Sequence, residues 1–189
     1  MLKDMKSKAM ILGGLVALLW LIEIVNFLAG GALDQFGIVP RTWIGLRGIV
    51  LAPFIHGSFA HLIANTTPFV ILGWLVLMRG TGEFVFACVC IMVVAGLGVW
   101  LTAGGNSIHF GASSVVFGLA GLLMARGYFE RSLLSVLLSI GVGIAYGGIL
   151  IGVLPGHPGI SWQGHLFGFI GGVLASRVIA IRARATSAI

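Results

Sequence analysis

The sequence predicts an all-α polytopic membrane protein, folded as one compact bundle of six transmembrane helices with both termini in the cytoplasm. The first observation is composition, because 59% of the 189 residues are hydrophobic and only 8% are charged, whereas a soluble domain has roughly a quarter charged residues. The second is the spacing of the charges: residues 48–78, 84–125 and 132–176 contain no Asp, Glu, Lys or Arg. The third is length, since a membrane-spanning helix needs about 20 apolar residues. By this length, residues 48–78 can hold one such helix, and residues 84–125 and 132–176 can hold two each.

Each helix follows from these stretches in chain order. The run 9–29 is apolar apart from Glu23 and predicts a first helix that is retained rather than cleaved as a signal peptide. The first uncharged stretch predicts a helix at about 60–78, preceded by a loop. Turn-forming residues at 104–107 and 154–159 interrupt the other two stretches. They predict helices at about 84–103, 112–127, 132–152 and 161–181.

The basic residues predict the orientation of the bundle. With the N-terminus inside, only Arg41 and Arg47 face outward, and the other nine basic residues lie on the cytoplasmic side. This asymmetry agrees with the positive-inside rule. The nine are Lys3, Lys6, Lys8, Arg79, Arg126, Arg131, Arg177, Arg182 and Arg184.

The longest connection, at about 30–59, is too apolar for an ordinary solvated loop, with Trp43 and Pro53 among its residues. It predicts a half-buried element in the outer leaflet. The other connections are short, so the whole chain, 1–189, is expected to form a single domain.

Several classes of partner are disfavoured. The net charge of +6 is spread in small groups along the chain, with no basic patch of the kind that binds nucleic acid. Cys88 and Cys90 lie in an apolar run and point to different helix faces, which favours neither a disulfide framework nor a metal site. We expect no nucleic acid, no metal and no cofactor. The sequence gives no oligomeric state.

Polar side chains inside the spans are costly, so each needs a reason. In this topology all the histidines fall toward the outer side of the membrane. His61 and Asn65 are four residues apart and share one helix face, where both can donate hydrogen bonds. Taken alone, they also fit an interhelical hydrogen-bond pair. The five histidines are His56, His61, His109, His157 and His165.

Ser113 lies in the segment Phe110 to Gly118, where a loop enters a helix. Free backbone N–H groups at a helix start favour developing negative charge, as an oxyanion hole requires. Taken alone, Ser113 also fits a helix N-cap.

His165 lies about one turn into the last helix, beside a stripe of small residues at Gly164, Gly168 and Gly172. The helix after Ser113 has its own small positions, so the two helices can pack closely and bring Ser113 and His165 together. Ser, His and a His/Asn pair are the minimum groups for acyl transfer. No acidic residue is available in the outer half of a span to orient His165, so we expect a dyad, with Phe117 packed on its ring. The alternative for His165 alone is a core histidine bonded to a carbonyl.

Three motifs in this order resemble the signatures of rhomboid intramembrane serine proteases. They are His56-Gly57-Ser58-Phe59-Ala60-His61 followed by Asn65, then Gly111-x-Ser113, then His165-x-x-Gly168-x-x-x-Gly172. The stretch from Gly37-Ile38-Val39-Pro40-Arg41 to Pro53-Phe54 is similar to the first loop of that family. The resemblance covers about residues 35–175.

The resemblance implies a serine endopeptidase that cleaves membrane proteins, single-span or polytopic, in or near their transmembrane segments. Ser113 would be the nucleophile and His165 the general base, while His61, Asn65 and the Ser113 backbone N–H would stabilise the oxyanion. The protein would lie in the lipid bilayer of a bacterial plasma membrane, with its active site toward the outer face. Near the site the resemblance places Gly111, Phe117 and Gly168.

Two positions depart from the family pattern. Ser114 follows the nucleophile where glycine is usual, which would place a hydroxymethyl group close to the oxyanion site. Phe117 stands where tyrosine is common.

Other chemistries are less well supported. A zinc protease would need a motif such as H-E-x-x-H, which is absent. An aspartyl protease would need two intramembrane aspartates, but Asp4 and Asp34 lie outside the expected spans. Two alternatives stay open: a catalytically inactive rhomboid-like protein that binds transmembrane helices, and a small transporter or channel that uses Glu23.

Overall fold

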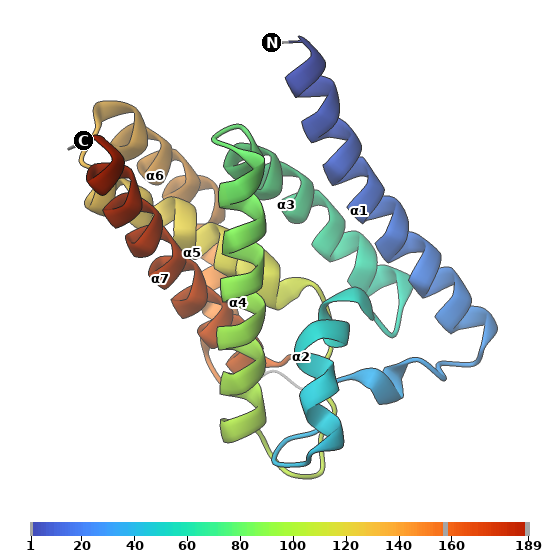
Figure 1. Cartoon of the computed structure of the whole chain (residues 1–189). Helices are drawn as coiled ribbons and strands as arrows, with labels where there is room; N and C mark the ends of the chain where they lie inside the picture. The colour runs from blue at the N-terminus through green and yellow to red at the C-terminus, as the bar shows by residue number, and fades with distance from the viewer. Residues whose placement is uncertain (1, 157–158, 188–189) are drawn as a thin grey trace.

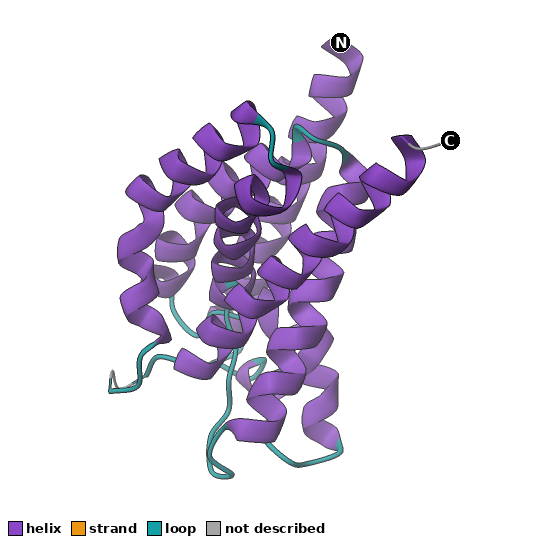
Figure 2. Ribbon diagram, turned by 90° about the vertical axis from the view of Figure 1, so that its left-hand side faces the viewer, coloured by secondary structure: helices purple, strands orange, loops and turns teal. Residues whose placement is uncertain are grey.

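The computed structural model describes residues 2–156 and 159–187. Within this part of the chain the regular structure is helical, apart from one isolated antiparallel bridge between Ile38 and His109. Figure 2 shows the same arrangement, helices joined by short loops. His157, one of the five histidines singled out above, lies outside the described residues.

In the described residues, six long helices form the bundle (Figure 1), and short helical segments lie between them. The long helices are α1 (Leu2–Leu28), α3 (Phe59–Leu77), α4 (Thr81–Thr102), α5 (Ser113–Glu130), α6 (Leu133–Tyr146) and α7 (Trp162–Ser187). The short segments are η1 (Asp34–Phe36), η2 (Ile44–Arg47), α2 (Gly48–Leu51), η3 (Ala52–Phe54) and η4 (Gly147–Val153).

Two predicted boundaries were wrong. The first helix begins at Leu2 rather than at residue 9, because the lysine-rich start continues the helix and Lys8 pairs with Asp4 one turn earlier at 2.8 Å. The last helix, expected to end at about 181, continues to Ser187. The span expected at 132–152 is present at Leu133–Val153, but its part after Tyr146 is the tighter 3₁₀ segment η4. Gly147 and Gly148 begin that segment, and glycine is a poor helix former.

Among the described residues, five helices are long and apolar enough to cross a membrane: α1, α3, α4, α6 extended by η4, and α7. The sixth expected span, α5, is less apolar because it contains serines, glycines, Arg126 and Glu130. Since it packs against α3, α4, α6 and α7, most of its surface faces protein. The count of six spans stays a prediction.

Helices α5 and α7 pack through their small residues, as the glycine spacing predicts. A Cβ atom on Gly168 would collide with the carbonyl of Ser114, and one on Gly172 would collide with the carbonyl of Gly118. Only glycine permits such close contact between backbones. This contact sets the first turn of α7 beside the first turn of α5.

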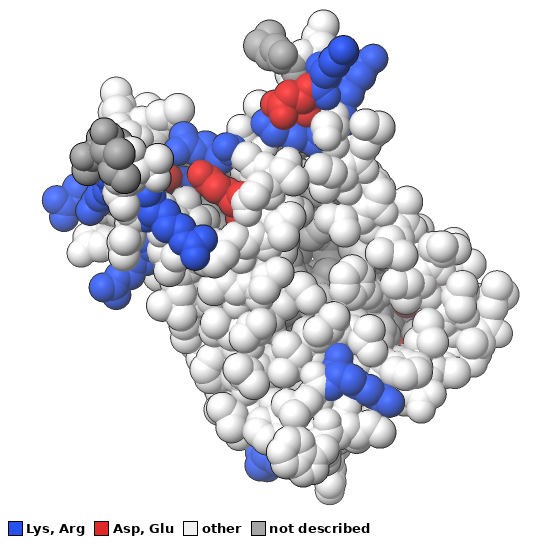
Figure 3. All heavy atoms as spheres, viewed as in Figure 1, with Lys and Arg blue, Asp and Glu red and all other residues white. Residues whose placement is uncertain are grey.

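Both termini lie at the same end of the bundle (Figure 1), and Lys and Arg gather there (Figure 3). Arg126 is buried near this end and pairs with Glu83 on α4 and with Glu130 at 2.7 Å. Arg79 approaches Glu130 at 3.5 Å. These ion pairs join the turn between α3 and α4 to α4 and α5 at one end of the bundle.

At the opposite end, the connection between α1 and α3 folds over α4. Ile49 fills the space above Gly96, and Trp100 Nε1 donates to the Thr42 carbonyl at 2.8 Å. Arg41 Nη1 donates to the Ala103 carbonyl at 2.7 Å. Trp43 stays exposed. The segment is therefore fixed to the bundle on one face and apolar on the other.

Candidate active site

Ser113 is the first residue of α5. Gly111, two residues earlier, has φ +123°, a conformation that favours glycine. Its N–H donates to the Ala52 carbonyl at 2.9 Å, which ties this turn to η3. Within the described part of the chain no side chain caps the helix. The N–H groups of its first turn, which lie near the Ser113 hydroxyl, therefore have no side-chain partner there.

His165, in the first turn of α7, lies beside Ser113 with Nε2 3.0 Å from the serine Oγ. Its Nδ1 is 2.9 Å from the Gly152 carbonyl. A carbonyl oxygen only accepts hydrogen bonds, so Nδ1 has the hydrogen and Nε2 has the free lone pair. That is the tautomer in which His165 can accept the Ser113 proton.

The His165 ring is held from one face by Phe117, one turn along α5 from Ser113. The two rings are stacked, with centroids 3.9 Å apart and planes at 11°. A Cβ atom on Gly152 would lie 2.9 Å from the Phe117 ring and 3.1 Å from His165 Nδ1. Gly152 thus leaves room for the stack and supplies its carbonyl.

Gly152 is the residue at this site that sequence reasoning missed. An orienting carboxylate can be sought in a sequence, but every residue has a carbonyl, so the type of residue gives no signal. The only sign of this position in the sequence was a glycine within an apolar run. Because the chain has 30 glycines, that sign does not single out Gly152.

His61 and Asn65 lie in the first two turns of α3. His61 Nδ1 is 2.9 Å from the His56 carbonyl, and Asn65 Nδ2 donates to the His61 carbonyl at 3.1 Å. A Cβ atom on Gly111 would lie 3.0 Å from His61 Nε2. The imidazole of His61 therefore lies against the turn that precedes Ser113, in space that only glycine leaves open.

One cavity of about 720 Å³ joins these groups. The structure brings four of the predicted site residues and Phe117 to its wall, whereas Gly111 and Gly168 lie behind the wall in packing contacts. The lining includes Ser113, His165, His61, Asn65 and Phe117.

His56 supports the turn before Ser113 from behind. Its side chain is 1% exposed, and its Nε2 accepts a hydrogen bond from the Ala112 N–H at 3.3 Å. Burial, together with the nearby His61, lowers the pKa of His56 to about 4. The ring is therefore neutral at pH 7 and can serve as this acceptor.

His109 connects two loops at the rim of the cavity. Its Nδ1 is 2.7 Å from Ser161 Oγ, just before α7, and its Nε2 is 2.8 Å from Ser107 Oγ. Burial lowers the pKa of His109, which favours the neutral ring. Because it bonds to Ser107 and Ser161, His109 holds the start of α7 against the loop before α5.

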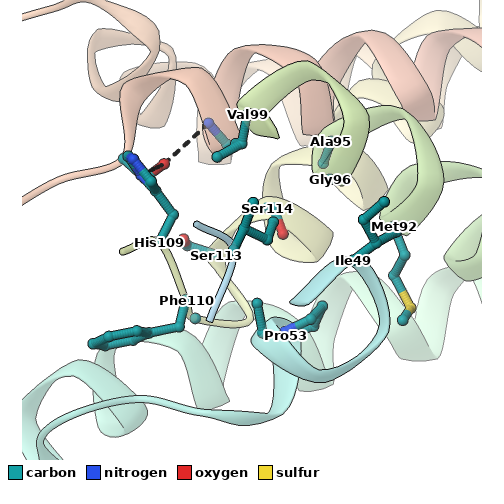
Figure 4. Close-up of a pocket in the computed structure, with 15 residues that line it drawn as sticks. Ile49, Pro53, Met92, Ala95, Gly96, Val99, His109, Phe110, Ser113 and Ser114 are labelled. Atoms are coloured by element: carbon teal, nitrogen blue, oxygen red, sulfur yellow. Dashed lines mark hydrogen bonds between the residues drawn. The ribbon is translucent and has the colours of Figure 1, made fainter. Parts of the chain in front are cut away.

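Ser114 does not line the large cavity, although it shares a smaller one with Ser113. It lines a second, much smaller cavity of about 20 Å³ on the α4 side, with Met92, Ala95 and Val99 (Figure 4). It is not part of the wall of the large cavity. The extra hydroxymethyl group therefore has room away from His61 and Asn65.

The chain matches the family model described as Rhomboid domain over residues 43–182, a range that includes all four of the predicted catalytic and oxyanion residues. Uncharacterized proteins of Mycobacterium tuberculosis and Mycobacterium leprae are 39% and 36% identical to it over 182 residues, which is 92% of this chain and 76% and 72% of theirs. A candidate rhomboid protease of Bacillus subtilis is 27% identical over 150 residues, or 75% of this chain and 70% of its own.

Proposed function

The chain belongs to the rhomboid family, and from this premise we propose that it is an intramembrane serine protease that uses Ser113 and His165 as a dyad. The observation that supports it best is the direction of the hydrogen bonds from Gly152 through His165 to Ser113, with distances of 2.9 and 3.0 Å. Nδ1 donates to the carbonyl, so Nε2 accepts from the serine hydroxyl.

In the first half of the reaction, Ser113 Oγ attacks the carbonyl carbon of the substrate peptide while its proton passes to His165 Nε2. The tetrahedral intermediate then collapses, and the same proton passes from Nε2 to the leaving amine. In the second half, water loses a proton to Nε2 and attacks the acyl-enzyme. The released serine takes that proton back. Phe117 keeps the imidazole ring in one plane throughout.

The oxyanion is stabilised by groups at the edge of the same cavity. The Ser113 N–H, His61 and the amide of Asn65 are the candidate donors. Each donor typically contributes about 10²–10³-fold in rate. His56, through its hydrogen bond with the Ala112 N–H, positions the turn that contains the first of these groups.

We place the protein in a bacterial plasma membrane, with six spans, cytoplasmic termini and the cavity toward the outer face. The asymmetry of the basic residues supports this orientation. A cavity with polar walls inside an apolar bundle suits a peptide bond in or near a transmembrane segment, so membrane proteins are the proposed substrates.

The test is cleavage of tagged single-span substrates in proteoliposomes by the wild type and by Ser113→Ala. We expect product from the wild type alone, because removing a nucleophile typically costs at least about 10³-fold. Equal thermal stability of the two proteins in detergent is the control. Product from both would show that Ser113 is not the nucleophile, and product from neither would favour a family member that binds helices without cutting them.

A further inference from the structure

The active-site cavity has an acidic side chain in its wall that the proposed reaction does not use. Apart from the histidines, Asp34 is the one ionisable residue that lines the cavity among the described residues. It lies at the start of η1, in the connection between α1 and α3.

Among the described residues, only one oxygen of Asp34 takes part in a hydrogen bond. Oδ1 accepts from Asn26 Nδ2 at 2.9 Å, and Asn26 Oδ1 accepts from the Leu33 N–H at 2.8 Å. Oδ2 lies between two glycines, 3.5 Å and 3.8 Å from where Cβ atoms would stand on Gly31 and Gly57. Among the described residues no donor is hydrogen-bonded to Oδ2, and Gly57 is itself part of the cavity wall.

A second carboxyl group lies behind Asp34. Glu23 is 2% exposed, interacts electrostatically with Asp34 and His61, and has one buried oxygen with no hydrogen-bond partner. Within the described part of the chain, neither Glu23 nor Asp34 forms an ion pair with Lys or Arg.

The basic residues at this end are occupied elsewhere. Arg41 bonds to backbone carbonyls at the end of α4. Arg47 donates to the Gln35 carbonyl at 3.0 Å and lies over the Phe36 ring. Among the described residues, this side of the cavity therefore has two carboxyl groups and no Lys or Arg paired with them.

We propose that Asp34 is a specificity-determining residue that binds a Lys or Arg side chain of the substrate inside the cavity. The proposal rests on the proposed proteolytic function and identifies a substrate class for it: membrane proteins with a basic residue close to the scissile bond. A carboxylate oxygen without a donor, facing a cavity that holds the nucleophile, is a ready acceptor for an ammonium or guanidinium group.

Asp34 also ties the η1 loop to α1, and two variants separate this role from recognition. Asp34→Asn keeps an oxygen for Asn26 but removes the charge. Asn26→Ala keeps the carboxylate but removes the tether. If Asp34 serves only to tie the η1 loop to α1, Asn26→Ala should change stability, and neither variant should change substrate preference.

The experiment is a competition in proteoliposomes between matched single-span substrates. Lys, Gln or Glu replaces, in turn, each residue of the segment that flanks the cleavage site on the outer side. We expect the wild type to prefer Lys to Gln by about fivefold at one or two positions and to disfavour Glu there. The preference should be lost in Asp34→Asn, reversed in Asp34→Lys, retained in Asn26→Ala, and weakened at high salt.

The outcomes distinguish the two proposals. If the wild type cuts all substrates equally while Ser113→Ala cuts none, the specificity proposal is wrong and the proteolytic function stands. A Lys preference that persists in Asp34→Asn also overturns the assignment to Asp34. If no substrate is cut, both proposals fall.

Discussion

The two ends of α5 bury polar groups in opposite ways. At the first residue, Ser113 meets His165 through uncharged hydrogen bonds and opens into a cavity of about 720 Å³. Near the last turn, Arg126 is 2% exposed and bonds to both Glu83 and Glu130. Ser135 on α6 adds a further hydrogen bond to Glu130. The same helix thus has an open, neutral end and a closed, ionic end.

The difference separates reactivity from stability. At the Ser113 end, the side chains proposed to move a proton line an open cavity. Replacing one of them leaves few charged groups without a partner. At the Arg126 end, two carboxylates pair with one buried guanidinium, and removing Arg126 leaves both without this partner. Mutations at the first end should therefore change the rate of cleavage, and mutations at the second should change the free energy of unfolding.

After the loss of Ser113 itself, the largest effect we expect is at the open end, from His61→Ala or Asn65→Ala. Each should lower the rate of cleavage by about 10²–10³-fold, because each removes one proposed oxyanion donor. The measurement is initial rate in proteoliposomes, with the unfolding midpoint in detergent as control. Rates within twofold of the wild type in both variants would remove this pair from the mechanism.

Arg126→Met tests the closed end. It should lower the free energy of unfolding by about 3 kcal/mol, because two carboxylates lose their buried partner. The measurement is reversible unfolding in mixed micelles. Arg126→Lys keeps the charge but cannot bond to both carboxylates as the guanidinium does. Its free energy of unfolding should lie between those of the wild type and Arg126→Met.

Cleavage per folded molecule should be unchanged in Arg126→Met. Unchanged stability, or a rate loss without destabilisation, would contradict the division of roles between the two ends of α5.

Gly152→Ala should slow cleavage by about tenfold with little change in KM. The added methyl group would press on Phe117 and on His165 Nδ1, and overpacking costs roughly 1–3 kcal/mol, where about 1.4 kcal/mol corresponds to a factor of ten in rate. The matched control is Gly148→Ala in the same segment, where a Cβ atom would meet nothing within 4 Å. Equal rates for the two variants would mean that the stack of Phe117 on His165 does not depend on the space that Gly152 leaves open.

Ser114→Gly should have the smallest effect, within about twofold of the wild-type rate. Ser114 lines the small cavity on the α4 side and not the wall around His61 and Asn65. The measurement is the same initial rate, and complete loss of cleavage would point to Ser114 as the nucleophile in place of Ser113.

Much of this molecule could be predicted from local patterns. Long uncharged stretches identified the helices, because the cost of burying charge in lipid acts on each segment separately. The span that begins near residue 132 was placed correctly, but the change to 3₁₀ geometry at Gly147 was not predicted, since it depends on what the segment packs against. The glycine spacing on α5 and α7 also predicted their close contact, because small residues at intervals of four form a flat face.

By itself, the sequence determined that this is a helical membrane protein with Ser113, His165, His61 and Asn65 in the order found in the rhomboid family. Tertiary structure alone decided that the Gly152 carbonyl orients His165, that Ser114 faces away from the cavity, and that Asp34 faces into it. The physical reason is that chemical identity and helical periodicity are local properties of a chain. Which carbonyl or carboxylate meets a given imidazole is fixed only when segments distant in sequence pack together.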